Sequence, residues 1–210
     1  GFPEAEKIIS RTFKSDTENY FAGMLLAKIF NAAGKFEKSI DLLKNLKILP
    51  YEHSTEGRKI YTKAYIGSTS QNLMSNKPGK ALDRLKESLL WPEHLGAGKP
   101  FDPEERIQRF LMAFSYIDQN KDAFAKSELI KIAEYSKKQL FKLSKQHLLG
   151  IYALQEIEGK ESAMNFIEQL IESKNGNHPV TKELIKFYFE NKNLKWNKTF
   201  IKDIVSFFEY

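Results

Sequence analysis

The residues with the clearest chemical potential form a short glycine-rich stretch, Gly96-Ala97-Gly98-Lys99. Backbone amides in such a stretch can surround an anion, and a neighbouring lysine can neutralise its charge. A nucleotide-binding phosphate loop, however, needs a glycine where Glu93 stands, a serine or threonine where Pro100 stands, and a preceding β-strand. The pattern therefore favours a rigid connection between helices, with Trp91 and Leu95 packed inward, over a phosphate site.

The other residue types that could bind a metal or catalyse a reaction are scattered. The four histidines, which are too dispersed to form the i, i+4 pair of a helical metal site, are His53, His94, His147 and His178. His147 lies on an apolar stripe and is expected to be a hydrogen-bonded packing residue, whereas His94 is expected to face solvent. The absence of cysteine excludes disulfides, thiolate metal sites and a cysteine nucleophile. We therefore expect no catalytic residue, metal or cofactor, and the chain is not predicted to be an enzyme.

Charged residues are numerous but mixed in sign. Lysine and arginine number 33 and aspartate and glutamate 27, giving a net charge of +6. The lysines are dispersed among glutamates, which favours a solvated surface and does not predict nucleic-acid binding. The densest group lies on one predicted helix beside Phe141 and consists of Lys137, Lys138, Lys142 and Lys145. An anionic partner on that helix is the alternative to simple solvation.

No segment approaches the roughly 18 apolar residues that a membrane-spanning helix needs. The chain begins Gly-Phe-Pro-Glu, without the basic start and apolar stretch of a signal peptide. We therefore predict a soluble protein without a membrane partner, and its localisation stays open. The first residues resemble the second helix of an earlier repeat, so the chain is expected to be a fragment of a longer protein.

Helical periodicity runs through almost the whole sequence, and no stretch alternates convincingly as a β-strand does. The fold class is therefore predicted to be all-α. Between Asp16 and Pro50, apolar stripes on two predicted helices flank Gly34, which can adopt the left-handed conformation of a helix end. The two stripes are Leu25, Leu26, Ile29 and Phe30, then Ile40, Leu43 and Leu46. This segment is predicted to be a helical hairpin.

Residues suited to tight turns recur about every 40 residues, which is typical of a helical repeat array. They are Gly34, Asn76, Asn120 and Gly159, each between two predicted helices and each able to adopt positive φ. Asp102, Pro103 and Glu105 form a typical helix start, with an N-cap, a proline in the first turn and a glutamate that reaches back. They predict a helix from Pro103 to about Asp118, and a further long helix is predicted from Lys137 to Ile157.

The segment from Tyr20 to Pro50 resembles a tetratricopeptide repeat, a unit whose two antiparallel helices interlock through small residues. The matching positions are Leu26 and Ala27 as the large-small pair, Phe30 and Phe36 as aromatic residues, Gly34 at the turn and Ser39 as a small residue. Gly23 departs from the pattern, which has a large residue there. Later units match less fully, through Ala81, Leu82 and Leu85, then Met112, Ala113, Tyr116, Ala125 and Leu129. Other α-solenoid families, with periods of about 40 to 47 residues, are the alternative.

This resemblance implies a single domain over residues 1–210, built as a right-handed superhelix of antiparallel helical hairpins. The hairpins are expected at about 17–50, 55–90, 103–135, 137–173 and 179–210, with 3–13 as the second helix of an earlier repeat.

A second resemblance is carried by the segment from Ala81 to Tyr135, through its Ala81-Leu82 helix and the Trp91–Pro100 loop. The segment is similar to the helical repeat region of bacterial DUF5107-type multidomain proteins, in which the repeats follow a β-rich module with features of carbohydrate enzymes. This resemblance implies an alternative function. The chain would then be an accessory region of a carbohydrate-active or mutarotase-like enzyme, with the catalytic module outside this sequence.

The leading functional prediction is a non-catalytic interaction or scaffold module that binds a protein or peptide on its concave face. Other domains of the same parent chain are also possible partners. By repeat position, that face is expected to include Phe21, Met24, Lys28, Asn31, Lys63, Ile66, Ser70, Phe110, Phe114, Leu149 and Ala153. The inter-repeat loop adds Trp91, His94 and Lys99 as candidate binding residues. The alternative for Phe110 and Phe114 is a place in the core of a repeat.

The final predicted helix is more apolar than the end of a repeat array is expected to be. Its apolar residues are Phe200, Ile201, Ile204, Val205, Phe207 and Phe208. We expect it to fold back on the preceding helix and to contribute in part to a homodimer contact.

Overall fold

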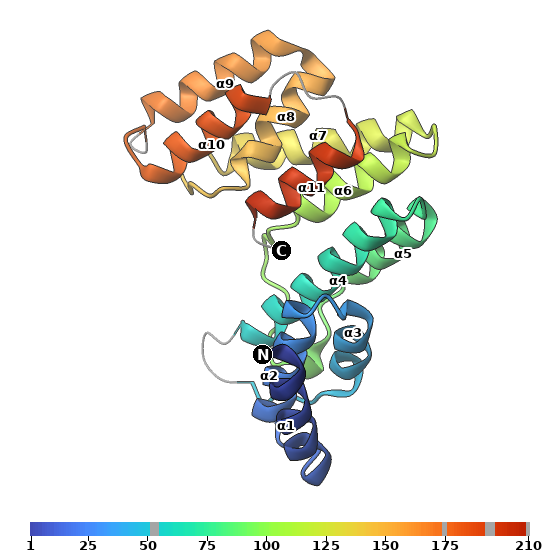
Figure 1. The fold of residues 1–210 in the computed structure, drawn as a ribbon. Helices are drawn as coiled ribbons and strands as arrows, with labels where there is room; N and C mark the ends of the chain where they lie inside the picture. Colours follow the sequence, from blue (N-terminus) through green and yellow to red (C-terminus); the bar gives the residue numbers. More distant parts are fainter. Residues whose placement is uncertain (51–54, 174–175, 192–195, 209–210) are drawn as a thin grey trace. The chain divides into compact units, whose positions relative to one another are not determined.

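The computed structural model describes residues 1–50, 55–173, 176–191 and 196–208, and within these ranges every regular element is a helix and none is a β-strand. The predicted all-α class is therefore confirmed. The helices, shown in Figure 1, are α1 (Phe2–Ser15), α2 (Tyr20–Ala32), α3 (Phe36–Asn45), α4 (Glu56–Met74), α5 (Pro78–Ser88), the short 3-10 helix η1 (Glu93–Leu95), α6 (Arg106–Ile117), α7 (Asp122–Lys138), α8 (His147–Glu158), α9 (Lys160–Glu172), α10 (Pro179–Asn191) and α11 (Lys198–Phe207). His53 lies outside the described residues.

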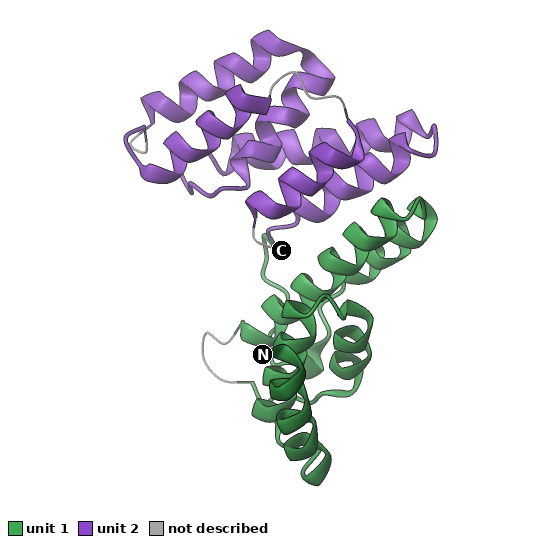
Figure 2. Ribbon diagram, viewed as in Figure 1, with its two compact units in different colours: residues 1–103, 210 green, residues 104–209 purple. Residues whose placement is uncertain are grey.

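The chain forms two compact units, which Figure 2 distinguishes by colour. Unit 1 comprises Gly1–Pro103 with helices α1 to α5, and unit 2 comprises Glu104–Glu209 with helices α6 to α11. The boundary lies in the segment that joins α5 to α6. A single right-handed superhelix through both units stays a prediction.

The core of unit 1 lies between successive helices. Helix α2 packs against α1, α3 and α4, and α4 also packs against α3 and α5. The buried side chains at the centre of this unit are Met24, Ala27, Ile40, Leu43, Leu46, Ile48, Ile60, Tyr61, Ala64, Tyr65 and Leu95. The small residues Ala27 and Ala64 are fully buried, which lets the helices approach closely.

Unit 2 repeats the scheme of neighbouring contacts, with α6 against α7 and α8, and α8 against α7, α9 and α10. Its last helix, α11, packs on this group through aromatic side chains. The ring of Phe200 lies 6.1 Å from that of Phe110 on α6 and 4.9 Å from that of Tyr152 on α8. Phe207 lies 4.6 Å from Phe187 on α10. The predicted fold-back of the final helix is therefore confirmed, while its part in a homodimer stays a prediction.

The four predicted turn residues all adopt positive φ, at 70° for Gly34, 55° for Asn76, 56° for Asn120 and 98° for Gly159. Three of these turns share one hydrogen bond, in which the residue after the turn donates its backbone N–H to a carbonyl five residues earlier. The bonds are Lys35 to Phe30 at 2.8 Å, Lys77 to Asn72 at 2.9 Å and Lys121 to Tyr116 at 2.9 Å. The same backbone hydrogen bond therefore forms at the turns of three hairpins.

One predicted helix start is wrong. Helix α6 begins at Arg106, so Asp102 is not its N-cap and Pro103 does not lie in its first turn. The reason is the side chain of Glu104, which accepts hydrogen bonds from the backbone N–H and the Nε of Arg106, at 3.2 and 2.8 Å. Glu104 is therefore held outside the helix, and the chain reaches its helical conformation later than the proline suggests.

The predicted long helix from Lys137 is also wrong. Helix α7 continues to Lys138, a non-helical segment follows, and α8 begins only at His147. The buried His147 ring contacts the backbone of this segment, which replaces the hydrogen bonds of a continuous helix. The lysines expected to share one helix face with Phe141 are therefore divided between the end of α7 and the connecting segment.

Glycines lie where the first helix of a hairpin crosses an earlier helix. At Gly67 on α4, an added Cβ would overlap the ring of Phe36 on α3. At Gly150 on α8, it would overlap the side chain of Ser136 on α7. Gly23, which departs from the tetratricopeptide pattern, lies against Leu46 in the same way. A large residue is excluded there because the neighbouring side chain already fills the space.

We predict that Gly67→Ala destabilises the protein by about 1–3 kcal/mol, since α3 and α4 must separate to admit the methyl group. The matched control is Gly79→Ala on α5, where an added Cβ meets nothing within 4 Å. That control should raise stability by about 0.5 kcal/mol through helix propensity. Urea denaturation followed by circular dichroism measures both. Equal effects of the two substitutions would contradict the close crossing.

Candidate functional site

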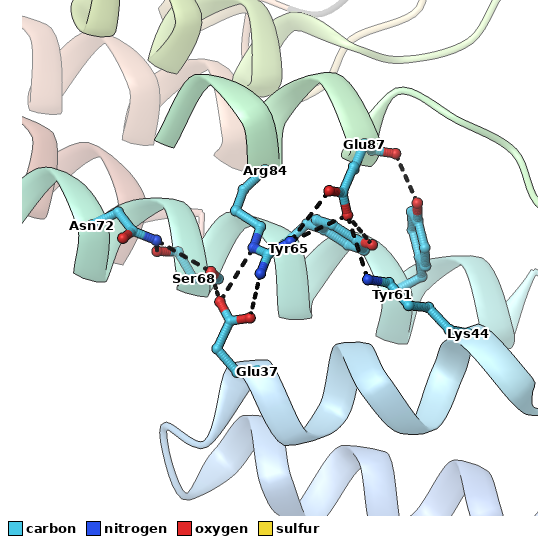
Figure 3. A network of polar contacts seen from close by, with 8 residues as sticks. All are labelled: Glu37, Lys44, Tyr61, Tyr65, Ser68, Asn72, Arg84 and Glu87. Carbon is cyan, nitrogen blue, oxygen red and sulfur yellow. Dashed lines mark hydrogen bonds and ion pairs between the residues drawn. The ribbon is translucent and has the colours of Figure 1, made fainter. Parts of the chain in front are cut away.

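A connected network of polar side chains joins α3, α4 and α5 in unit 1 (Figure 3). Glu37 of α3 accepts hydrogen bonds from the hydroxyl of Ser68 on α4 and from the guanidinium of Arg84 on α5, whose Nη2 lies 2.6 Å from Oε2. Glu87 of α5 accepts a 2.8 Å hydrogen bond from the hydroxyl of Tyr65 on α4. Other members of the network are Lys44, Tyr61 and Asn72. The network thus links each of the three helices to the other two.

Two side chains of this network, Glu37 and Tyr65, have shifted pKa values. Partial burial acts to raise the pKa of Glu37, but the hydrogen bond from Ser68 and the charge of Arg84 outweigh it and lower the pKa. Burial raises the pKa of Tyr65, and the hydrogen bond to Glu87 raises it further. General acid–base catalysis needs a group whose pKa lies near the working pH. Both shifts lead away from neutrality, and both groups form hydrogen bonds between helices.

A cleft of about 480 Å³ lies beside this network. Its lining residues are Glu37, Asn72, Lys80, Asp83, Arg84 and Glu87. Acids and bases are mixed in this lining, and Arg84 is already engaged by Glu37 and Glu87. The cleft therefore offers no concentrated charge of one sign to an ionic ligand.

The end of α5 is held by a buried arginine from the start of α4. Arg58 donates hydrogen bonds to the carbonyls of Leu90 and Ser88, at 2.5 and 2.7 Å, and its guanidinium lies 4.3 Å from the centre of the Trp91 ring. A cation at the carboxyl end of a helix also interacts favourably with the helix dipole. The candidate binding residue Trp91 is therefore half-buried as part of this contact.

Unit 2 contains a corresponding buried arginine. Arg106, the first residue of α6, donates a 3.1 Å hydrogen bond to the hydroxyl of Ser136 near the end of α7 and lies 5.2 Å from the ring centre of Tyr135. It also forms an ion pair with Glu104. In both units, therefore, an arginine at the start of one helix contacts the end of its hairpin partner and an aromatic ring there. Neither arginine could be identified from the sequence, because a single arginine at a helix start gives no distinctive pattern.

We predict that Arg58→Lys destabilises the protein by about 2 kcal/mol, because an ammonium group cannot reach both carbonyls or stack as a guanidinium does. Arg11→Lys is the matched control, since Arg11 is exposed on α1, and it should change stability by less than about 0.5 kcal/mol. Thermal and urea unfolding of the two variants provide the measurement. If Arg58→Lys is as stable as the unsubstituted chain, the contact does not hold the hairpin.

The loop after α5 is ordered by contacts with the end of α3. The His94 carbonyl accepts a 2.7 Å hydrogen bond from the N–H of Ile48, and the His94 Nε2 lies 3.0 Å from the carbonyl oxygen of Leu43. Leu95 is buried, as predicted, and Gly96 adopts positive φ. His94 is exposed, also as predicted, although one ring nitrogen contacts the protein. Lys99 lies exposed beyond these contacts.

His147 is fully buried and hydrogen-bonded, which confirms the prediction of a packing role. Its Nε2 lies 3.1 Å from the carbonyl oxygen of Gln139, and its Nδ1 lies 3.2 Å from the backbone nitrogen of Ser144. The same Nδ1 also lies 3.0 Å from the carbonyl oxygen of Ser144. Burial lowers the pKa of His147, and the nearby charge of Arg106 lowers it further.

This lowered pKa predicts a pH dependence of stability. Below about pH 6.5 a histidine in the unfolded chain binds a proton that the folded His147 does not. The free energy of unfolding should therefore decrease as the pH decreases, by up to about 1.4 kcal/mol per pH unit. The loss continues until the pH reaches the folded-state pKa. His147→Gln should lower stability at pH 7 but flatten this slope, whereas His178→Gln, at an exposed position, should retain it. Denaturation curves between pH 7 and pH 5 test the difference in slopes.

The predicted binding residues of unit 1 are not equally accessible. Lys28 is 50% exposed and forms an ion pair with Glu56 of α4, and Lys63 and Ser70 are half-buried on α4. Asn31, by contrast, is buried and donates a 3.1 Å hydrogen bond to the carbonyl of Ile60. Asn31 therefore joins α2 to α4 and is not available to a partner.

Two apolar residues of α2 are exposed beside Lys28. Phe21 is 63% exposed and Leu25 is 45% exposed, although Leu25 was expected to pack inward with Leu26. Their spacing with Lys28 places all three on one side of the helix. On α4, Glu56, Lys59 and Lys63 have equivalent spacing, and the Lys28–Glu56 pair joins the two rows. We call these six residues the α2–α4 face.

In unit 2 the predicted concave residues are buried. Phe110 is fully buried and stacks on Trp196 at 4.8 Å, and Phe114 is only 4% exposed. The alternative of a core position is therefore the one that the structure supports for both residues. Their repeat position on the first helix of the hairpin was identified correctly, but the chain covers Phe110 with its own final segment.

The described residues contain no group of three or more histidine, aspartate or glutamate side chains arranged to hold a metal ion. Nor does any helix in the described ranges have the length and apolar character needed to cross a membrane. Comparison with protein-family models, curated proteins and solved structures gives no match. The resemblances to tetratricopeptide repeats and to DUF5107-type proteins therefore stay predictions.

Proposed function

We propose that the chain is a tetratricopeptide-like helical repeat module that binds a protein partner through the α2–α4 face. The observation that carries the proposal is the pair of exposed apolar side chains, Phe21 and Leu25, beside charged residues on a packed helix. Apolar and aromatic anchors bordered by polar groups are typical of protein interaction sites. A helix that contacts three others and still exposes such a row has a surface suited to a further partner.

Three recurring features support the repeat arrangement. One turn hydrogen bond occurs at Gly34, Asn76 and Asn120, and a buried arginine contacts the hairpin partner in each unit. Glycines on α2, α4 and α8 admit side chains of other helices. Recurrence of the same local devices in successive hairpins is what a repeat protein requires, because each unit packs mainly on its neighbours.

The electrostatics support a binding role without catalysis. The shifts of Glu37, Tyr65 and His147 each favour the protonation state that the group has at neutral pH. These groups also serve as hydrogen-bond partners between elements. Each of these three groups therefore has a packing role that accounts for its shift, and proton transfer is not needed to explain it.

Selection from a random peptide library against the immobilised protein tests this function. We predict that selected peptides bind the α2–α4 face and lose at least about tenfold in affinity with Phe21→Ala, the effect of removing an interface anchor. Phe124→Ala is a closely matched control, because Phe124 is 60% exposed and stacks on a tyrosine as Phe21 does. It should leave affinity unchanged.

Circular dichroism confirms that both variants remain folded before their affinities are compared. Peptides that bind equally well to the unsubstituted protein and to Phe21→Ala would place the binding surface elsewhere. Failure to enrich any peptide would contradict the proposal as a whole.

A further inference from the structure

The structure contains its own example of a helix bound to the first helices of two hairpins. In unit 2, α11 lies against α6 and α8, with Phe200 between Phe110 and Tyr152. The preceding Trp196 stacks on Phe110 and donates a 3.0 Å hydrogen bond from Nε1 to Glu156 of α8. Helix α11 is amphipathic, since Phe200, Ile201, Ile204 and Val205 are buried while Lys202 is exposed. The α6 and α8 pair thus receives an amphipathic helix.

Helices α2 and α4 of unit 1 correspond to helices α6 and α8 of unit 2 in their order along the chain and in their mutual contact. In each case the two helices contact each other and are the first helices of consecutive hairpins. Counted from the turn residues Gly34 and Asn120, the exposed residues Phe21, Leu25 and Lys28 correspond to Ile107, Leu111 and Phe114.

These corresponding positions differ sharply in burial. The three α6 residues are between 0 and 4% exposed, whereas the three α2 residues are between 45 and 63% exposed. Within unit 2, α11 reaches α6 through the ring of Phe110, which lies one turn from Ile107 and Phe114 on the helix. By the same count Phe110 corresponds to Met24 of α2, which is buried at 6% exposure. Two of the three positions, Phe21 and Leu25, are therefore apolar and exposed in unit 1, whereas their counterparts in unit 2 are buried.

The charge of the α2–α4 face adds a second constraint. Its charged residues are Lys28, Glu56, Lys59 and Lys63, so the face carries more positive than negative charge. Glu56 is already engaged by Lys28. The side chain of Lys59 is exposed and lies on the same side of α4 as Glu56. A partner with carboxylates beside its apolar row would complement this arrangement, and one with lysines there would be repelled.

We infer that the α2–α4 face binds an acidic amphipathic α-helix, whose apolar row contacts Phe21 and Leu25 and whose carboxylates lie near Lys59. This inference rests on the proposed function and specifies the partner's chemistry. The apolar row supplies the contact area, as Phe200 does on α6 and α8. The carboxylates set the orientation of the bound helix and exclude basic helices.

The test uses the full chain and three fluorescent peptides of about 15 residues, long enough to form a helix on binding. The first carries Phe, Ile and Leu at helical spacing with glutamates on both sides. The second replaces the glutamates by lysines, and the third is the first with a central proline that prevents a continuous helix. Fluorescence anisotropy should show the first binding at least about tenfold more tightly than the other two.

Paired variants locate the binding. Phe21→Ala and Lys59→Glu should each lower the affinity for the glutamate peptide at least about fivefold. The controls Phe124→Ala and Lys86→Glu, at exposed positions elsewhere, should leave this affinity unchanged. Higher salt should also weaken binding, since exposed charges contribute to it.

Each alternative outcome has a distinct meaning. Equal or tighter binding of the lysine peptide or the proline peptide to this face overturns the acidic-helix inference and leaves the proposed function intact. The same holds if no designed peptide binds while library-selected peptides still depend on Phe21. If the glutamate peptide binds with an affinity that neither Phe21→Ala nor Lys59→Glu changes, the inference fails. If the affinity of library-selected peptides is also unchanged by Phe21→Ala, the proposed function fails with it.

Discussion

The hydrogen bonds of a buried arginine across the open end of a hairpin are the contacts on which much of this structure depends. A hairpin of two helices is joined covalently at its turn, and its other end must be held by side chains. In α4–α5 that end is held by Arg58, which satisfies two carbonyls at the end of α5. In α6–α7, Arg106 reaches Ser136. A buried cation is stable only with such partners, so the contact fixes the position of one helix along the other.

Close crossings at glycines fix the helices of neighbouring hairpins. Gly67 and Gly150 can receive Phe36 and Ser136 only if each helix keeps its register against the preceding one. A shift by one residue would bring a side chain with a Cβ to the crossing, where there is no room. The arginines therefore hold the helix pairs α4–α5 and α6–α7, and the glycine crossings hold the pairs α3–α4 and α7–α8. The network around Glu37 adds a third link, because Glu37 of α3 accepts hydrogen bonds directly from α4 and from α5.

The parts that the sequence predicted correctly are those with a local physical cause. Positive φ at Asn76 and Asn120 follows from the short side chain of asparagine and the flanking helical periodicity, which do not depend on distant residues. The start of α6 was wrong because Glu104 binds Arg106, which is itself held by Ser136 far along the chain. Leu25 was placed inward because the apolar stripe of α2 is wider than the surface its neighbours cover. In both cases the outcome depends on residues that are distant in the sequence, which a local pattern does not include.

Phe110 shows why a binding face cannot be assigned from repeat position alone. Its place on α6 is that of a residue expected to meet a ligand, and it does meet a helix, but that helix is α11 of the same chain. Burial then gives Phe110 the energetic role of a core residue, with about 1.5–3 kcal/mol of transfer free energy for such a side chain. Phe21 on α2 has similar chemistry but lies 63% exposed. An aromatic residue on the first helix of a hairpin therefore stabilises the fold where the chain itself covers it, as at Phe110, and is accessible to a partner where the chain leaves it exposed, as at Phe21.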